Sequence, residues 1–460
     1  MNTTHDAVIV GTGQAGPPLA SRLSREGMSV AIVERHLVGG TCVNTGCIPT
    51  KAMVASAYAA HLARRAADYG VTIDGRIGVD IASVKARKDA ISAKSRQGLE
   101  KMLNGLEKCD VFRGHARFRS AREVAVGETL LRADRIFINV GGRAAVPKLP
   151  GIDGTPFLTN SSMMDLSVLP EHLVVVGGSY VGLEFGQMFR RFGSQVTIVE
   201  MGSALIGRED ADVSGAIRDL LEEEGIGVRL NARCITVSGG GSKVTAHVEC
   251  TEGEPAVTGS HLLLATGRRP NTDDLGLDVA GIKQDERGYV VVDDQLRTSV
   301  EGVWALGDCN GKGAFTHTSY NDYEIVAANL LESGQRRVSD RIPAYALYID
   351  PPLGRAGLTE AQVRDRGRPA LVGTRAMTRV GRAVEKGETK GFMKVLVDRD
   401  SREILGASVL GTGGDEVIHC VLDTMYAKAP CDVLQHAVNI HPTVSELIPT
   451  VLGELKPLQV

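Results

Sequence analysis

The sequence predicts an α/β fold in which an α+β region follows two β-α-β units. The prediction rests on a repeated strand–turn–helix–strand pattern, a high glycine content and a change of pattern after about residue 341. Glycine supplies 54 of the 460 residues, more than the ~7% of an average protein. Because no collagen-like period accompanies it, we attribute the excess to tight turns and close backbone approaches.

Two segments of the chain nearly repeat each other. They read AVIVGTGQAGPPLASRLSREGMSVAIVE at residues 7–34 and LVVVGGSYVGLEFGQMFRRFGSQVTIVE at residues 173–200. In each, an apolar run leads through a glycine-rich turn and a helical stretch to a second apolar run. Its final Glu lies 23 residues after the first Gly of the turn. Two such units imply two separate dinucleotide sites.

The first unit contains a complete GxGxxG motif at residues 11–16. Gly11 permits the tight turn, Gly13 lets backbone N–H groups approach a pyrophosphate, and Gly16 allows close packing of helix and strand. Glu34, at the end of the next strand, can accept hydrogen bonds from a ribose diol. The strand–turn–helix–strand–Glu context favours a dinucleotide site over a simple turn.

The second unit has Ser179 at the second glycine position, between Gly177 and Gly182. Serine is small, so a phosphate can still approach the backbone there. Glu200 would repel the 2′-phosphate of NADP and suits the free 2′-hydroxyl of NAD. We therefore predict a preference for NADH over NADPH at this site.

The segments around the two units also have recognisable secondary structure. Residues 50–109 are expected to form two helices, and strand-like segments follow and end at 135–140. Residues 141–143 and the proline-rich turn at 147–156 are expected to be a crossover linker. Strands are expected over 226–267 and 302–306, a helix over 320–332, and α+β structure from about residue 341.

The sharpest motif is GGTCVNTGCIPTK at residues 39–51. Cys42 and Cys47 can reach disulfide distance in a turn or in the first turns of a helix. A helix that begins here would stabilise a thiolate through its dipole, and Lys51 adds a positive charge. The alternatives are unreactive core cysteines and a zinc site, but zinc needs about four ligands and no CxxC pair is present nearby. We therefore predict a redox-active pair and no metal site.

Another motif, HPTVSE, places Glu446 five residues after His441. The carboxylate could orient and charge the imidazole, which would make the pair an acid–base dyad. Taken by itself, the pattern fits a surface or packing histidine better than a catalytic one.

Composition and charge argue against other classes of protein. The 52 Lys and Arg against 55 Asp and Glu leave a formal net charge of −3, so nucleic acid is not an expected partner. No apolar run approaches the ~18 residues of a membrane span, and no basic region precedes the first strand as in a signal peptide. A cysteine pair of this kind suits a reducing compartment, and we predict a cytoplasmic location.

Taken together, the motifs resemble those of the class I flavoprotein disulfide reductases, such as glutathione reductase, dihydrolipoamide dehydrogenase and mercuric reductase. The resemblance covers essentially the whole chain. Its anchors occur in the family's order: the first GxGxxG, GGTCVNTGCIPTK, GGSYVGLEF at 177–185, ATGRRPN at 265–271, ALGDC at 305–309 and HPTVSE at 441–446. It implies Rossmann-like FAD and NAD(P) domains and a C-terminal α+β dimerisation domain. The implied limits are 1–145 and 271–340 for FAD, 146–270 for NAD(P) and 341–460 for dimerisation.

The resemblance also implies roles for matching residues. Cys47 would be the thiolate beside the flavin, in a charge-transfer complex, and Cys42 the interchange thiol that attacks the substrate. Lys51 and Glu184 would pair near the flavin N5. Further cofactor contacts would come from Gly40, Thr41, Gly141 and Asp308 for FAD, and from Gly177, Tyr180, Gly182, Glu200 and Gly267 for the nicotinamide nucleotide, with Tyr180 gating its pocket. His441 and Glu446 would complete the active site of a partner subunit, so a homodimer is expected.

The implied reaction passes a hydride from NAD(P)H to FAD and then reduces a Cys42–Cys47 disulfide. The Cys42 thiolate would attack an oxidised small molecule while protonated His441 gives its proton to the leaving thiol. We predict a small disulfide or a thiol-reactive oxidant of the hypothiocyanous acid type as substrate.

Two alternative functions stay open. They are mercuric reductase and the dihydrolipoamide dehydrogenase subunit of a 2-oxoacid dehydrogenase complex. Mercuric reductases carry a vicinal Cys pair at the extreme C-terminus and a Tyr in place of the dyad His. Residues 453–460 contain no Cys and His441 is present, so efficient Hg(II) reduction is not expected.

Overall fold

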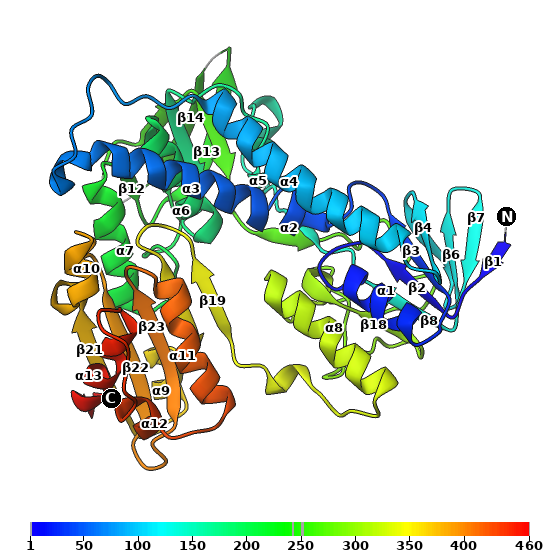
Figure 1. The fold of residues 1–460 in the computed structure, drawn as a ribbon. Helices are drawn as coiled ribbons and strands as arrows, with labels where there is room; N and C mark the ends of the chain where they lie inside the picture. The colour runs from blue at the N-terminus through cyan, green and yellow to red at the C-terminus, as the bar shows by residue number, and fades with distance from the viewer. Residues whose placement is uncertain (1, 242, 250–252, 460) are drawn as a thin grey trace.

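The computed structural model describes residues 2–241, 243–249 and 253–459, which form three bodies (Figure 1). The N-terminal body lies at the right of Figure 1, a body from the middle of the chain at the top, and the C-terminal body at the lower left. This arrangement confirms the predicted fold class. The domain limits at residues 145, 270 and 340 stay predictions.

The N-terminal body is built on a parallel sheet of five strands in the order β18-β8-β2-β3-β4. Its strands are β2 (Ala7–Val10), β3 (Val30–Glu34), β4 (Cys109–Arg113), β8 (Arg135–Ile138) and β18 (Val303–Ala305), with α1 (Gly16–Arg25) between β2 and β3 and α8 (Thr316–Leu331) after β18. The chain therefore returns to its first sheet after it has formed the middle body.

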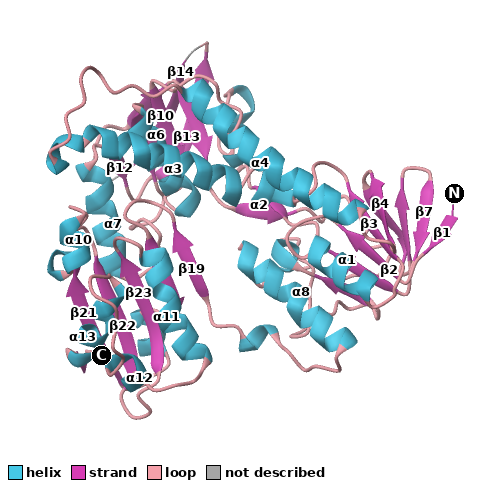
Figure 2. Cartoon of the chain, in the orientation of Figure 1, coloured by secondary structure: helices cyan, strands magenta, loops and turns pink. Residues whose placement is uncertain are grey.

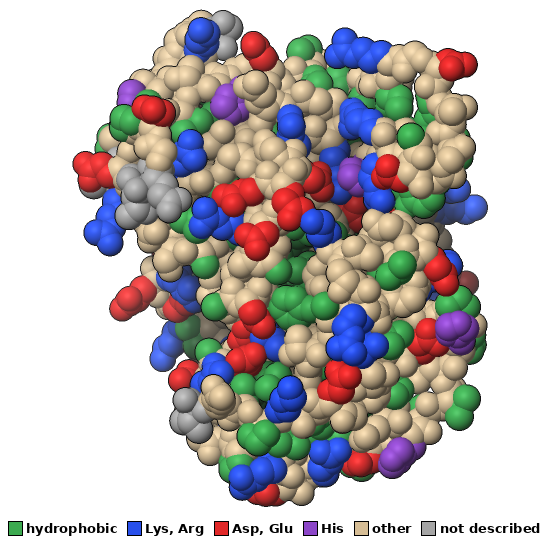
Figure 3. All heavy atoms as spheres, turned by 90° about the vertical axis from the view of Figure 1, so that its left-hand side faces the viewer, with side chains coloured by type: hydrophobic (Ala, Val, Ile, Leu, Met, Phe, Trp, Pro, Cys, Tyr) green, Lys and Arg blue, Asp and Glu red, His purple; other side chains and the backbone are tan. Residues whose placement is uncertain are grey.

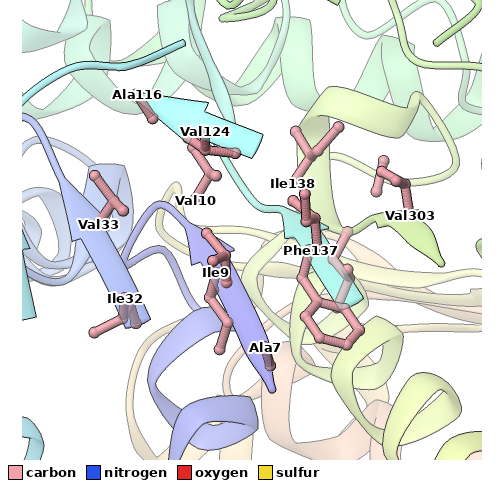
Figure 4. Close-up of a cluster of buried hydrophobic side chains, with 14 of the residues drawn as sticks. Ala7, Ile9, Val10, Ile32, Val33, Ala116, Val124, Phe137, Ile138 and Val303 are labelled. Carbon is pink, nitrogen blue, oxygen red and sulfur yellow. The ribbon is translucent and has the colours of Figure 1, made fainter. Parts of the chain in front are cut away.

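The core of this body explains why β2 and β3 read as unbroken apolar runs. A parallel sheet is covered on both faces, so each of its strands is buried on both sides. Every residue of β2 and β3 is buried. Figure 4 shows Ile9 and Ile32 in the same cluster as Phe137 and Ile138 of β8.

Three further helices and a small sheet complete the N-terminal body. The helices are α2 (Gly40–Asn44), α3 (Cys47–Arg64) and α4 (Ile81–Asn104), and the sheet has the order β1-β7-β6-β5, with β1 (Asn2–Thr4), β5 (Ala116–Ser120), β6 (Glu123–Val126) and β7 (Thr129–Arg132). The two predicted helices of residues 50–109 are thus α3 and α4. Asp80 caps α4 by accepting hydrogen bonds from the backbone N–H groups of Ala82 and Ser83.

The middle body repeats the first unit. Its parallel sheet has the order β12-β11-β10-β16, beside an antiparallel sheet β13-β14-β15. The elements are α5 (Asn160–Met163), β10 (His172–Val176), α6 (Tyr180–Phe192), β11 (Gln195–Val199), α7 (Ala211–Glu223), β12 (Gly227–Arg229), β13 (Arg233–Gly240), β14 (Lys243–Glu249), β15 (Ala256–Gly259) and β16 (His261–Leu264). The expected crossover is a paired ribbon, since β9 (Gly142–Ala144) on the way in pairs antiparallel with β17 (Arg268–Pro270) on the way out.

The C-terminal body is an antiparallel sheet in the order β19-β20-β23-β22-β21-β24 with helices around it. Its elements are β19 (Ala344–Leu347), β20 (Leu353–Gly357), α9 (Glu360–Asp365), β21 (Ala370–Ala376), α10 (Gly381–Glu385), β22 (Phe392–Asp398), β23 (Ile404–Leu410), α11 (Gly414–Tyr426), α12 (Asp432–Gln435), α13 (Ile448–Gly453) and β24 (Lys456–Pro457). In Figure 2, a segment that is mostly loop joins α8 to β19.

Buried ion pairs tie the middle body to the C-terminal body. The side chain of Lys394 is 1% exposed, and its Nζ lies 2.7 Å from carboxylate oxygens of both Asp212 and Glu360. The Arg355 side chain is 2% exposed and pairs with Glu209 and Asp210. Each buried cation thus has carboxylate partners that balance its charge.

The outer surface carries charges of both signs. Figure 3 shows Lys and Arg side chains interspersed with Asp and Glu over the face formed by the middle and C-terminal bodies. Each helix in the described part of the chain is too short or too polar to cross a bilayer.

Candidate active site

A cavity of about 660 Å³ is lined by residues from the N-terminal, middle and C-terminal bodies. It brings together most of the residues predicted for the FAD site and the redox centre. From that set, its walls include Gly11, Gly13, Glu34, Gly40, Thr41, Cys42, Cys47, Lys51, Gly141, Tyr180, Glu184 and Asp308. The predicted residues outside its walls are Gly16, Gly177, Gly182, Glu200, Gly267, His441 and Glu446.

Backbone segments approach one another closely at the GxGxxG end of the cavity. Gly11 has a φ of +106°, and a Cβ there would lie 2.3 Å from the carbonyl oxygen of Asn139. A Cβ on Gly40 would lie 2.9 Å from the Cα of Gly13. Because these positions exclude side chains, backbone N–H groups at the start of α1 can reach a bound phosphate. This cradle fits a dinucleotide pyrophosphate.

Two carboxylates in the cavity wall suit the sugar-like parts of FAD. Glu34 accepts hydrogen bonds from the N–H groups of Thr12, at 3.1 Å, and His36, at 2.8 Å. Asp308 Oδ2 lies 3.6 Å from Nε of Arg268, and burial raises the pKa of Asp308. Both side chains can accept hydrogen bonds from hydroxyl groups. The residues present therefore fit FAD.

The two predicted redox cysteines lie on consecutive helices. Cys42 is in α2 and Cys47 is the first residue of α3, and their side chains are hydrogen-bonded to each other. That bond is the main reason why the pKa of Cys47 is lowered to about 6. The Thr316 hydroxyl and the Lys51 charge also lower this pKa, while burial opposes them. The hydrogen bond to Cys47 and burial raise the pKa of Cys42. At neutral pH Cys47 is therefore the thiolate and Cys42 carries the proton.

Lys51 and Glu184 form the predicted ion pair beside the cysteines. Nζ of Lys51 lies 2.9 and 2.7 Å from the two carboxylate oxygens of Glu184, whose side chain is 5% exposed. The N–H group of Tyr348 donates to the same carboxylate at 3.1 Å. Lys51 also lies over the Tyr348 ring, 4.4 Å from its centre. The pair thus joins α3, α6 and the residue that follows β19.

Thr316 was not among the predicted site residues, but its hydroxyl lies 3.1 Å from the Cys47 sulfur. The predicted helix began at Tyr320, but α8 begins at Thr316. The extra turn is stabilised because the Phe315 N–H donates to the Thr318 hydroxyl at 3.2 Å. A glycine-rich loop followed by Thr residues is typical of a helix start, and this signal could have revealed the turn.

The second dinucleotide unit has the close contacts that its glycines predict. A Cβ on Gly177 would lie 2.4 Å from the carbonyl oxygen of Ala265, and one on Gly182 would lie 2.0 Å from that of Gly177. The Glu200 carboxylate accepts hydrogen bonds from the N–H groups of Gly178, at 2.6 Å, and Gly202, at 2.7 Å.

Two further residues predicted to contact the nicotinamide nucleotide lie in the turn after β16 and at the start of α6. Gly267 is in the turn between β16 and β17 and has a φ of +118°. Tyr180, the first residue of α6, also lines the cavity, so the second unit meets the first site at this tyrosine.

His441 and Glu446 form a dyad, but on the outside of the chain. Nδ1 of His441 lies 3.1 and 3.0 Å from the two carboxylate oxygens of Glu446. The His441 side chain is 80% exposed. Nearby Val438 and Ile440 are 101% and 79% exposed. Within one chain, the dyad does not contribute to the cavity that holds the cysteines.

Two nucleotide-binding units, a cysteine pair at a helix N-terminus and a cradle that fits FAD define a flavoprotein disulfide reductase. Residues 5–322 match the pyridine nucleotide-disulphide oxidoreductase family, and residues 343–452 match the dimerisation domain of that family. The chain belongs to this family. It is an oxidoreductase that uses FAD and NAD(P)H, and its C-terminal body is a dimerisation domain.

Several known proteins are similar over nearly their whole length. The probable pyridine nucleotide-disulfide oxidoreductase RclA of Escherichia coli (strain K12) is 35% identical over 96% of this chain and 97% of its own. Mercuric reductase of Streptomyces lividans is 33% identical over 97% and 95%. Dihydrolipoyl dehydrogenase of Rhizobium etli is 32% identical over 97% of each chain.

Solved structures give the same result. The HOCl-induced flavoprotein disulfide reductase RclA of Escherichia coli superposes with a TM-score of 0.89 at 34% identity, covering 97% of this chain and 99% of its own. A Cu(II) complex of the same protein gives a TM-score of 0.90 over 98% and 99%.

Proposed function

We propose that this flavoprotein reduces a small disulfide or a thiol-reactive oxidant of the hypothiocyanous acid type at Cys42 and Cys47. The observation that carries the proposal is the arrangement of the two sulfurs. Cys47, with a pKa of about 6, is hydrogen-bonded to the Cys42 thiol and borders the cavity. A thiolate and a thiol in contact can together give two electrons to an oxidised substrate and form a disulfide.

In this proposal, bound FAD, once reduced by the nicotinamide nucleotide, would supply the electron pair that reduces the Cys42–Cys47 disulfide. Gly11, Gly13 and Gly40 would border its pyrophosphate, and Glu34 would accept hydrogen bonds from its ribose. The other contacts proposed for FAD are Gly16, which lets α1 pack against β2, and Thr41, Gly141 and Asp308 in the cavity wall.

The sulfur steps exchange one bond at a time. The Cys42 sulfur gives up its proton and attacks one sulfur of the substrate disulfide, which forms a mixed disulfide and releases the first substrate thiolate. The Cys47 thiolate then attacks Cys42, which forms the Cys42–Cys47 disulfide and releases the second thiolate. The two cysteines lose two electrons, and the substrate disulfide gains them. With hypothiocyanous acid, the first step releases hydroxide, which takes up a proton, and the second releases thiocyanate.

We assign the proton transfers to His441, oriented by Glu446, of a second copy of the chain. Three observations support this assignment. The dyad lies in the dimerisation domain, its imidazole is 80% exposed in the single chain, and apolar side chains at Val438 and Ile440 are exposed beside it. An exposed apolar surface of this kind is typical of a subunit interface.

NADH is the proposed donor, because Glu200 directly follows β11 and lies beside the glycine turn. Its carboxylate would accept hydrogen bonds from a ribose diol and repel a 2′-phosphate. Gly177, Gly182 and Gly267 would let the nucleotide backbone approach, and Tyr180 would cover the nicotinamide site. We also place the protein in the cytoplasm, a reducing compartment that suits this cysteine pair.

A substrate panel tests the proposal. The holoenzyme would be supplied with NADH or NADPH and, in turn, small disulfides, hypothiocyanous acid, and Hg(II) with excess thiol, while nicotinamide oxidation is followed. We expect turnover with a disulfide or hypothiocyanous acid, its loss in Cys42→Ser, and its retention in Cys109→Ser, a cysteine outside the cavity. Undiminished turnover in Cys42→Ser would refute the proposal.

The relatives named above favour two lesser alternatives, and the same assay separates them. Sustained turnover of Hg(II) would identify a mercuric reductase. Rapid reverse turnover with dihydrolipoamide and NAD⁺, together with co-purification of an acyltransferase core, would identify a dihydrolipoamide dehydrogenase subunit.

A further inference from the structure

An aromatic stack stands at the first turn of α8, on both sides of Thr316. The Phe315 ring lies 5.4 Å from the His317 ring and 5.7 Å from the Tyr345 ring, with interplanar angles of 10° and 5°. Thr316 is the residue between Phe315 and His317, and its hydroxyl contacts the Cys47 sulfur. Because both chain neighbours of Thr316 are held in one stack, its backbone has little freedom to turn the hydroxyl away.

The far end of the stack is anchored in another body. The Tyr345 hydroxyl donates a hydrogen bond to Oε1 of Glu209, which precedes α7 in the middle body. Tyr345 and Arg355 are directly opposite each other in the β19–β20 pair, so both side chains lie on one face of the sheet. Arg355 binds the same carboxylate through Nε, at 3.2 and 3.1 Å. The buried Glu209 therefore holds two cross-strand neighbours at once.

Tyr345 is in the right protonation state for this contact. Burial, the charge of Glu209 and the hydrogen bond to it raise the pKa of Tyr345, so the phenol keeps its proton and donates. Phe315, Thr316 and His317 line the cavity, whereas Tyr345 lies behind them, outside the cavity wall. The sulfur chemistry proposed above therefore has no direct use for Tyr345.

We propose that Tyr345, anchored by Glu209, is a positioning residue that holds Phe315 and, through it, the Thr316 hydroxyl against the Cys47 sulfur. The proposal rests on the proposed redox role of Cys47. It gives the dimerisation domain a part in the chemistry of its own subunit. The contacts run from the middle body through Tyr345 of the C-terminal body to the thiolate of the N-terminal body.

The experiment measures the Cys47 thiolate directly. Cys47 alkylation by iodoacetamide is followed against pH by mass spectrometry, in holoenzyme carrying Cys42→Ser, a change that keeps a hydroxyl donor in place of the thiol. The midpoint is the pH at which alkylation reaches half its maximal rate. Thr316→Val should raise this midpoint by about one pH unit, since a hydrogen bond to a charged group is lost. Thr316→Ser should leave it unchanged. Tyr345→Phe, which keeps the ring and loses the hydroxyl, should raise the midpoint by about half a unit.

A double-variant comparison separates positioning from general loosening. In a Thr316→Val background, Tyr345→Phe should cause no further shift, because the hydroxyl it positions is gone. Tyr58→Phe is the matched control. It removes another tyrosine–glutamate hydrogen bond to the C-terminal body, 2.5 Å to Glu388, but takes no part in the stack. Phe315→Leu removes the middle ring of the stack and should raise the midpoint as Tyr345→Phe does. It provides a second test in case the Tyr345 variant folds poorly.

Two results would overturn the proposal. In the first, Tyr345→Phe leaves the midpoint where it was; in the second, it shifts the midpoint equally with and without Thr316. Failure of the proposed function would look different, because Cys47 would then titrate as an ordinary thiol near ~8.5 even with Thr316 and Tyr345 intact.

Discussion

Most of the local contacts in the candidate site converge on the sulfur of Cys47. The Cys42 thiol, the Thr316 hydroxyl and the Lys51 ammonium each favour its charged form, while burial opposes them. Glu184 neutralises part of the Lys51 charge, which keeps the effect of that cation moderate. The result is a thiolate that is present at neutral pH and still able to act as a nucleophile.

The flavin spectrum should report this thiolate. In oxidised Cys42→Ser enzyme, the free Cys47 thiolate beside the flavin should give a long-wavelength absorbance shoulder, and Cys47→Ser should lack it even after reduction. Because the Thr316 hydroxyl and Lys51 still lower the pKa of Cys47, the shoulder should be present at neutral pH and disappear as the pH falls through this lowered pKa. A pH titration followed by visible absorbance checks this. Equal spectra for the two variants would show that the pair is not the redox centre.

Glu200 is the residue that should choose the nicotinamide cofactor. Losing its carboxylate should weaken NADH binding by about 1–3 kcal/mol, the range for a charged hydrogen bond. Glu200→Arg should move the preference toward NADPH, since Arg can pair with a phosphate. The test is kcat/KM for both cofactors, with Glu171→Arg, an exposed change in the same body, as control. An unchanged ratio, or a wild-type enzyme that already prefers NADPH, would count against this role.

At the scale of elements, the two nucleotide sites depend on helices that begin against a strand end. In both units, the point where the helix meets the turn has room only for the hydrogen atom of a glycine side chain. A Cβ on Gly16 would lie 2.4 Å from the carbonyl oxygen of Gly11, and one on Gly182 would lie 2.0 Å from that of Gly177. The helix N-terminus can therefore approach a phosphate closely.

Two glycine substitutions in the middle body should have opposite effects. Gly182→Ala should lower the melting temperature and weaken nicotinamide binding, because overpacking costs about 1–3 kcal/mol and displaces the start of α6. Gly215→Ala, in α7, meets open space and should stabilise the helix by about 0.5–1 kcal/mol. Thermal unfolding and NADH titration of the two variants test this prediction. Equal melting temperatures and equal NADH affinities would show that the close contact at Gly182 does not restrict the size of the side chain there.

At the scale of the whole molecule, the active site is assembled from parts that are distant along the chain. The cysteines come from the N-terminal body, Glu184 and Tyr180 from the middle body, and Tyr348 from the edge of the C-terminal body. The His441–Glu446 pair remains outside this assembly in a single chain. A dimer in which each C-terminal body faces its partner's cavity would complete both sites.

Mixing two inactive variants should restore activity. Cys47→Ser and His441→Gln should each be inactive or nearly so. Co-expression gives hybrid dimers, and in each hybrid one site has both Cys47 and His441 of the partner intact. With random pairing, about a quarter of all sites should be functional. Steady-state activity of the co-expressed pair measures this, against a Cys47→Ser, His441→Gln double variant as control. No recovery would show that each chain uses its own histidine.

Local patterns were enough to predict the fold class and much of the site. Gly11, Gly16 and Glu34 are linked by the geometry of one strand, turn and helix, so their spacing alone identified the unit. The same reasoning identified the second unit and a helix predicted from residue 50, which in the structure begins at Cys47. These features depend on backbone stereochemistry within a few tens of residues, which is why they can be read along the chain.

Only the tertiary structure decided which distant side chains meet. Lys51 and Glu184 are 133 residues apart, and the sequence paired them through the family resemblance alone. Cys47 and Thr316 are 269 residues apart, and neither spacing nor composition linked them. The contact of Tyr345 with Glu209 requires the middle and C-terminal bodies to pack in one arrangement. Such contacts follow from how buried faces fit together, and that fit is a property of the whole packed molecule.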